Sequence, residues 1–321
     1  MAVPPSLSCR SSALKSTKLI GNAQIKRAAQ SGDLGTAVIF DGPYGSGKKT
    51  AAAYAAAALL CRAREDKPCG HCPSCLQAAA GSHPDILFYD VPSDENHKIK
   101  NIRELRSKSF IRPSQSPFKV FILNRADLLT PESQNALLKV LEEPTSTVFI
   151  LTCENAMSLL QTIRSRCRTY ALEPLSPAVV EDWIATHPGS DVKYAPKDLR
   201  AAAESCGGSI GQALLYLDKG LPKPVKMAGD FVDSLTGSPL RIMEICLAAS
   251  GLTRSEYGDF YTAVTEALTK AALRDSRRAR YYVSVYEYIQ QQKDKLTDNN
   301  GSVFALSSQL AAFCGTINRS K

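Results

Sequence analysis

The segment "AVIFDGPYGSGKKTAAAYAAAALLC" (residues 37–61) decides the fold of this chain. Its first five residues form a short apolar run typical of a buried strand. The Ala- and Leu-rich run from Thr50 to about Arg64 is typical of a helix. A glycine-rich turn lies between them. A strand, a glycine-rich turn and a helix, in that order, predict a phosphate-binding P-loop, in which backbone N–H groups at a helix N-terminus meet an anion.

The turn follows the P-loop pattern except at one position. The pattern is Gly, four residues, Gly, Lys, and then Ser or Thr. Here Lys49 stands in the place of the hydroxyl residue, which normally ligates Mg²⁺, and Thr50 follows about 100° further round the helix. The loop therefore predicts a phosphate cradle and leaves open whether ATP or ADP binds in it. The candidate nucleotide-binding residues are Gly42, Gly45, Ser46, Gly47, Lys48, Lys49 and Thr50.

Further apolar runs alternate with helical stretches along the next hundred residues. This alternation predicts an α/β fold with a parallel sheet. Continuous apolar centres such as "FKVFILN" suit strands that are covered on both faces. The expected strands after 37–41 are 85–91, 118–124 and 147–153, and the expected helices between them are 99–109, 131–143 and 157–164.

The acidic residues of a P-loop hydrolase are missing from their expected place. Such an enzyme needs an acid at the end of a neighbouring strand to hold the Mg²⁺ shell. The strand "VFIL" (120–123) is followed by Asn124, which is neutral, and Arg125, which accepts no proton. Asp127 lies beyond the strand end, and Asp90 ends a rival strand with no second acid after it. We therefore expect no intrinsic ATP hydrolysis.

Four of the ten cysteines crowd into "CRAREDKPCGHCPSC" (61–75). Gaps of two residues let successive thiolates face one centre, and four thiolates close a tetrahedral shell around a structural Zn²⁺. Free thiols and an iron–sulfur cluster are the alternatives, and His71 could replace one cysteine. The predicted zinc ligands are Cys61, Cys69, Cys72 and Cys75.

Composition predicts a soluble, cytoplasmic chain that does not enter the membrane. The N-terminus has no apolar core typical of a secretory signal, and the longest apolar run, 51–61, is too short to span a bilayer. The net charge of +8 permits a nucleic-acid partner. A basic run at 98–112 would either contact DNA phosphates or form a solvated face.

The character of the chain changes after residues 172–177. Helical composition follows, and "GLPKPVKMAG" (220–229) resembles a linker. Three domains are expected. They are an α/β P-loop domain with the zinc module (1–172), a small helical domain (173–221) and an all-helical domain (222–321).

These motifs together resemble the bacterial DNA polymerase III clamp-loader subunits of the AAA+ class. The resemblance runs from about Leu19 to about Asp218 and rests on the P-loop, the cysteine cluster, "SQNALLKVLEEPTSTVFILTCENAMSLLQTIRSRC" and "GSIGQALLYLD". It implies an AAA+ domain, a helical lid and a C-terminal collar. It also implies a hetero-oligomer with gamma/tau and delta subunits that acts on a sliding clamp and primed DNA.

Within that family the chain looks like the stationary delta prime kind. Motor subunits carry Asp-Glu after the third strand, Thr after the P-loop Lys, and Arg in the lid motif. This chain has Asn124-Arg125, Lys49 and Gly211 at those places. The "SRC" motif implies that Arg166 is an arginine finger given to a neighbour's ATP site. The alternative is an active gamma/tau-type motor or another self-contained P-loop ATPase.

Overall fold

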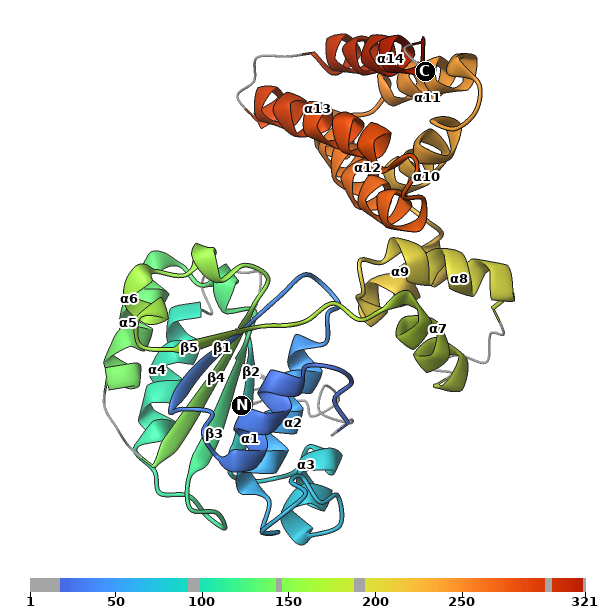
Figure 1. Ribbon diagram of the computed structural model, residues 1–321. Coiled ribbons are helices and arrows are strands. Elements are labelled where there is room, and N and C mark those ends of the chain that lie inside the picture. The colour runs from blue at the N-terminus through green and yellow to red at the C-terminus, as the bar shows by residue number, and fades with distance from the viewer. Residues whose placement is uncertain (1–17, 92–97, 143–145, 188–193, 298–301, 320–321) are drawn as a thin grey trace, which may run out of the picture. The chain divides into compact units, whose positions relative to one another are not determined.

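The computed structural model describes residues 18–91, 98–142, 146–187, 194–297 and 302–319. Within these residues the chain divides into two compact units (Figure 1). The first contains the chain up to Leu175 together with Ser209–Gly211. The second contains Ser176–Gly208 and the chain from Gln212 onward, and its regular structure is helical throughout. The division into three domains at residues 172 and 221 stays a prediction.

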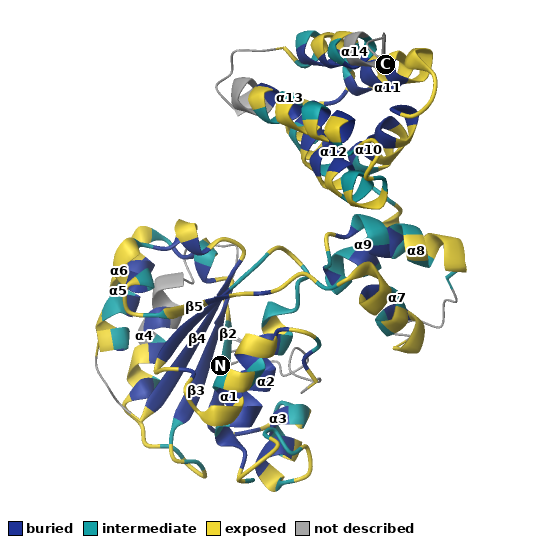
Figure 2. Cartoon of the chain, viewed as in Figure 1, coloured by how far each residue is buried: buried dark blue, intermediate teal, exposed yellow. Residues whose placement is uncertain are grey.

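A five-stranded parallel sheet forms the centre of the first unit and confirms the predicted α/β fold. Its strand order is β2-β3-β4-β1-β5, so all five strands end at the same edge. The P-loop leaves β1 at that edge. Figure 2 shows that most of the sheet is buried. The strands are β1 (Ala37–Asp41), β2 (Ile86–Asp90), β3 (Lys119–Asn124), β4 (Thr147–Cys153) and β5 (Arg168–Ala171).

The strand β5 was not predicted from the sequence. It is a short edge strand beside β1, and Tyr170 is its only buried residue. An edge strand with one buried side chain has no apolar run that a pattern search could find.

Helices cover both faces of the sheet. Because strand side chains alternate between faces, Val38 and Phe40 pack toward one helical layer, and Ala37 and Ile39 toward the other. The first layer contains α1 (Ala23–Ser31), α2 (Lys48–Leu60) and α3 (Pro73–Ala80); the second contains α4 (Lys98–Ser109), α5 (Pro131–Glu142) and α6 (Gln161–Arg164) (Figure 1). The helix expected at 157–164 is shorter, because a 3₁₀ turn, η4 (Ala156–Ser158), precedes α6. Glu143, the expected end of the helix before it, lies outside the described residues.

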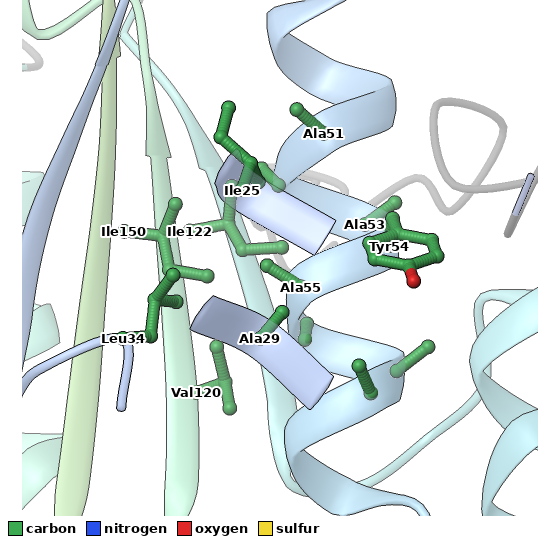
Figure 3. Close-up of a cluster of buried hydrophobic side chains, with 14 of the residues drawn as sticks. Ile25, Ala29, Leu34, Ala51, Ala53, Tyr54, Ala55, Val120, Ile122 and Ile150 are labelled. Atoms are coloured by element: carbon green, nitrogen blue, oxygen red, sulfur yellow. The ribbon is translucent and has the colours of Figure 1, made fainter. Parts of the chain in front are cut away.

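The helix that follows the P-loop is buried on nearly all sides. Its small side chains let α1 and the sheet approach it closely. Figure 3 shows Ile25 of α1, Ile122 of β3 and Ile150 of β4 around the alanines of α2. The close approach fixes the start of α2, and with it the P-loop, against the sheet. The buried alanines are Ala51, Ala52, Ala53, Ala55, Ala56, Ala57 and Ala58.

The second unit is built from eight helices within its described residues. The segment expected to be a linker at 220–229 is helical from Lys223, because the first turn of a helix needs no N–H group from Pro224. Among the described residues, no helix has the length and apolar character required to cross a membrane. The helices are α7 (Pro177–Thr186), α8 (Pro196–Ser205), α9 (Ile210–Lys219), α10 (Lys223–Ser234), α11 (Pro239–Ala249), α12 (Arg254–Arg274), α13 (Ala279–Thr297) and α14 (Val303–Arg319).

Enlarging one alanine of α2 should destabilise the first unit. Ala56 is fully buried, so Ala56→Leu forces the surrounding side chains apart, and we expect a loss of about 1–3 kcal/mol in the free energy of unfolding. Chemical denaturation followed by circular dichroism measures the loss. Ala23→Leu, at the exposed start of α1, is the matched control and should change stability little. Equal effects of the two variants would contradict the packing of α2 described above.

Candidate functional site

The P-loop forms one wall of a cleft of about 440 Å³ at the carboxyl edge of the sheet. Ligands of open parallel sheets bind at this edge. Of the seven predicted cradle residues, Gly45, Gly47, Lys48 and Lys49 line the cleft, whereas Gly42, Ser46 and Thr50 do not. The other lining residues are Tyr44, Asp90, Asn124, Arg125, Asp127, Cys153, Glu154 and Gly211.

The loop has the backbone shape that an anion cradle requires. Gly45 and Gly47 lie in the left-handed region, with φ of 73° and 92°, and α2 begins directly after Gly47. The Lys48 Nζ atom donates to the carbonyl oxygens of Gly42 (2.6 Å) and Pro43 (2.8 Å). The P-loop lysine is thus held at its own loop by two hydrogen bonds.

Burial and the nearby carboxylates act on the pKa of Lys48 in opposite directions, and the larger effect of burial leaves it lowered. Burial lowers the pKa of Lys48, while the carboxylates of Glu154 and Asp127 act to raise it. Asp127 also accepts a hydrogen bond from the Glu154 backbone N–H (3.3 Å), which places both acids on one side of the cleft.

Three side chains that depart from the ATPase pattern converge on the carboxylate of Asp90. Asn124 Nδ2 donates to Asp90 Oδ1 (2.7 Å), and Arg125 Nε donates to the same oxygen (2.9 Å). Lys49 Nζ lies 3.5 Å from Asp90 Oδ2. Burial opposes ionisation of Asp90, but the Asn124 hydrogen bond and the charges of Lys49 and Arg125 outweigh it and lower its pKa. Asp90 is therefore a carboxylate with three partners inside the cleft.

The backbone places this network. Asp90 and Asn124 are the last residues of β2 and β3 and pair directly in register. Arg125 follows in the left-handed conformation, with φ of 59°, and its N–H donates to Thr152 Oγ1 (3.2 Å), while the Thr152 hydroxyl donates to Asn124 Oδ1 (2.8 Å). The sequence had left Asp90 as a rival metal ligand. The structure instead makes it the partner of the three replacements.

The short segment Ser209–Gly211, which belongs to the first unit, contacts the P-loop. The Gly211 N–H donates to the Gly45 carbonyl (3.0 Å), and Ser209 Oγ donates to the Tyr44 carbonyl (2.9 Å). A Cβ atom at position 211 would lie 2.6 Å from the Gly45 Cα atom. Only glycine fits there, so Gly211 permits this contact.

The four predicted zinc ligands lie together. The sulfur atoms of Cys61, Cys69, Cys72 and Cys75 all lie within 4.8 Å of one another. Zn–S bonds of about 2.3 Å give sulfur–sulfur edges of about 3.8 Å in a tetrahedron, so the cluster needs little contraction around an ion. The residues present therefore fit a structural Zn²⁺.

Local hydrogen bonds prepare these sulfur atoms for a metal. The N–H groups of Cys69, Cys72 and Cys75 each donate, at 3.4 Å, to the sulfur of the preceding cysteine in the set. Burial opposes ionisation of Cys72, but hydrogen bonds from the backbone of Arg62 and Cys75 outweigh it and lower its pKa to about 6. A thiolate is the form that binds zinc.

His71, the alternative ligand, is not part of this group of four sulfur atoms. Its ring is exposed, and Nδ1 contacts the Cys69 carbonyl oxygen (2.9 Å). Ser74 Oγ donates to the Leu60 carbonyl (2.8 Å), which ties the start of α3 to the end of α2 and brings Cys61 beside Cys75.

Arg166 lies away from the P-loop cleft, just after α6. Its Nη2 atom donates to Glu142 Oε1 (2.6 Å), and its Nη1 atom donates to the Thr162 carbonyl (2.9 Å). The side chain keeps 38% of its surface exposed. Sequence reasoning missed Glu142, since nothing in the local pattern links it to a residue 24 positions later.

The basic run at 98–112 is described only in part. The side chains of Lys98, Lys100 and Arg103 lie outside the described residues. Lys108 pairs with Glu104 (2.6 Å), and the Arg106 guanidinium lies 6.0 Å from the centre of the Phe110 ring. A contact with DNA therefore stays a prediction.

Comparison with known proteins connects the first unit to DNA replication. Residues 20–176 match the family described as "DNA polymerase III, delta subunit". The chain is 36% identical to the DNA polymerase III subunit delta' of Bacillus subtilis over 152 residues, 46% of this chain and 45% of that protein. It is 33% identical to subunit gamma/tau of Mycobacterium bovis over 165 residues, 51% of this chain and 28% of that protein. The chain thus spans less than half the length of these relatives.

Two solved structures from Thermotoga maritima match most of this chain at low similarity. One is a DNA polymerase III gamma subunit-related protein, 17% identical, with 91% of this chain and 97% of that chain covered and a TM-score of 0.40. The other is the RuvB Holliday junction branch migration motor, 14% identical, with 81% and 80% covered and a TM-score of 0.43.

Removing one cysteine of the cluster should remove the metal. We expect the purified chain to carry zinc, and Cys69→Ser to lose most of it during dialysis against EDTA, because a thiolate ligand is gone. Metal content by mass spectrometry and the unfolding temperature are the measurements, and both should fall.

Cys206→Ser is the matched control for this experiment. Cys206 lies outside the cluster, and its sulfur contacts the Ala203 carbonyl oxygen, an interaction that a serine hydroxyl retains. Absence of zinc from the wild-type chain, or equal zinc in both variants, would exclude a zinc site here.

Proposed function

We propose that this chain, which matches the clamp-loader-type subunits of DNA polymerase III through residues 20–176, is the non-hydrolysing delta prime subunit. In this role it helps to load the sliding clamp onto primed DNA within a hetero-oligomer that contains gamma/tau and delta subunits. It takes part in DNA polymerase III holoenzyme function without turning over ATP itself. The observation that carries the proposal is the convergence of Lys49, Asn124 and Arg125 on Asp90.

The Asp90 network supports the absence of hydrolysis on chemical grounds. Phosphoryl transfer to water needs an ion-coordinating acid and a group that positions the attacking water. At the end of β3 these positions hold an amide and a guanidinium, and neither can accept a proton at neutral pH. Asp90, the nearest carboxylate, is already bonded to Asn124 and Arg125.

Arg166 is the residue through which this chain would contribute to catalysis. Its present partner, Glu142, is half exposed, and exposed ion pairs contribute only about 0–1 kcal/mol. The guanidinium can therefore exchange this carboxylate for the phosphates of a nucleotide bound to a neighbouring subunit. There it would stabilise the charge that develops during phosphoryl transfer.

The second unit supplies a surface suited to assembly. A groove of about 730 Å³ lies between α11 and α14. Exposed apolar side chains surround it, and such patches mark interaction sites. They support the proposal that the lid (173–221) is followed by an oligomerisation collar (222–321). The exposed residues are Leu240, Met243, Leu247 and Phe304.

The alternative is an active motor subunit of the gamma/tau kind or another self-contained P-loop ATPase. Similarity to gamma/tau, and the presence of Asp127 and Glu154 in the cleft, favour it. Against it, both acids lie on the Lys48 side, and Lys49 stands where the metal-ligating hydroxyl belongs.

ATP turnover by the isolated chain separates the two functions. We expect phosphate release at the background rate, because the metal-binding acid and the water-positioning residue are replaced. A coupled phosphate assay measures it, with an active gamma/tau preparation as the positive control. Turnover of the order of 1 s⁻¹, within the usual enzyme range, would identify this chain as a motor instead.

Replacing Arg166 tests its action on a neighbour. In an assembly with gamma/tau and delta, Arg166→Ala should slow the adjacent ATP site by on the order of 10³-fold, because the transition-state charge loses its guanidinium. Phosphate release by the whole assembly should fall by at least the fraction that this ATP site contributes.

Arg168→Ala is the matched control, since Arg168 is also a surface arginine with one carboxylate partner, Asp33 (3.1 Å). Unchanged turnover with Arg166→Ala in an assembly shown to be intact by gel filtration would rule out the finger role.

A further inference from the structure

The P-loop cleft carries built-in cations where a P-loop enzyme holds its metal ion. Mg²⁺ normally takes a hydroxyl from the residue after the P-loop lysine and an acid from a strand end. In this chain those residues are Lys49 and Asn124, with Arg125 next to Asn124. Lys49 and Arg125 lie on either side of the Asp90 carboxylate, at 3.5 and 2.9 Å.

The charges in this part of the cleft do not cancel. Two cations share one carboxylate, so Lys49, Arg125 and Asp90 together carry a net positive charge. Lys49 and Arg125 keep 46% and 44% of their side-chain surface exposed, so both are accessible to a ligand. The remaining acids of the cleft, Asp127 and Glu154, act on Lys48, its third cation.

The loop that would hold an anion is already formed. Gly45 and Gly47 have the left-handed conformations of the cradle. Ser209 Oγ and the Gly211 N–H donate hydrogen bonds to the carbonyl oxygens of Tyr44 and Gly45. A site that already has its bound conformation loses less conformational entropy when its ligand binds. A volume of about 440 Å³ also lies in the range of small-molecule sites.

We propose that this cleft binds a polyphosphate chain without Mg²⁺, as part of a nucleotide or free in solution, and that Lys49 and Arg125 supply the positive charge that a metal supplies elsewhere. Phosphate displaces Asp90 from both cations. The exchange is favourable because exposed carboxylate pairs are weak, whereas a guanidinium binds phosphate oxygens in a bidentate, charge-assisted manner. Mg²⁺ opposes binding, since it neutralises the phosphates and repels both cations.

Calorimetric titration of the full chain tests this directly. ATP, ADP and tripolyphosphate are each titrated in EDTA and again in excess Mg²⁺. We expect binding in EDTA that weakens by about tenfold in Mg²⁺, equivalent to the loss of one charge-assisted hydrogen bond. The tighter of ATP and tripolyphosphate identifies the source of the phosphate chain.

Charge variants assign the binding to these residues. Lys49→Gln and Arg125→Gln should each weaken binding in EDTA by about tenfold, and Asp90→Asn should strengthen it, because the competing carboxylate is lost. Arg27→Gln on the exposed side of α1 and Asp33→Asn are the matched controls. Circular dichroism establishes that each variant is folded.

Three results would overturn the proposal. They are the absence of binding by all three probes in EDTA, binding that requires Mg²⁺, and binding that survives the combined Lys49→Gln and Arg125→Gln variant. The proposal rests on the same Asp90 network as the proposed subunit role, but the two can fail separately, because ATP turnover and the effect of Arg166→Ala are measured apart from binding and Arg166 does not line this cleft.

Discussion

The candidate site depends on the contacts that the Asp90 carboxylate makes with three neighbouring side chains. It lies at the end of β2, in register with Asn124, and it holds the side chains of Asn124, Arg125 and Lys49. Through these contacts it links the end of β3 to the first turn of α2, in the region where a P-loop enzyme would place a metal and the terminal phosphates. Lys49, Asn124 and Arg125, which depart from the ATPase pattern, thus all bind one carboxylate. That carboxylate is a counter-ion beside the P-loop.

Next to this centre, the small side chains of α2 let the helix that follows the P-loop pack closely. The alanines of α2 bring the helix close to α1 and the sheet, and the P-loop is fixed at the start of that helix. Ser209 and Gly211 hold the same loop from outside. Arg166, by contrast, lies on the surface in a half-exposed pair with Glu142. The loop is therefore held by several contacts, whereas Arg166 is held at the surface by an exposed ion pair, which suits the arginine-finger role proposed above.

The sequence was sufficient for features written in local patterns. The strand, turn and helix of the P-loop and the spacing of the four cysteines each lie within a short segment, so their geometry follows from their spacing. It was insufficient where partners are distant, since Asn124 meets Asp90 across 34 residues and Arg166 meets Glu142 across 24. The sequence did not predict β5, because an edge strand needs little apolar character. It did not predict the start of α10, because the prolines there lie at positions that a helix tolerates.

The contact between Asn124 and Asp90 limits which substitutions the site can accept. Their side chains touch at 2.7 Å, so an aspartate at position 124 would set two carboxylates against each other. A threonine at position 49 would meanwhile remove one of the cations that hold Asp90. Each of these two substitutions is therefore unfavourable while Asp90 is present. The carboxylate that holds these side chains thus also disfavours the acid and the hydroxyl that a metal site would need at positions 124 and 49.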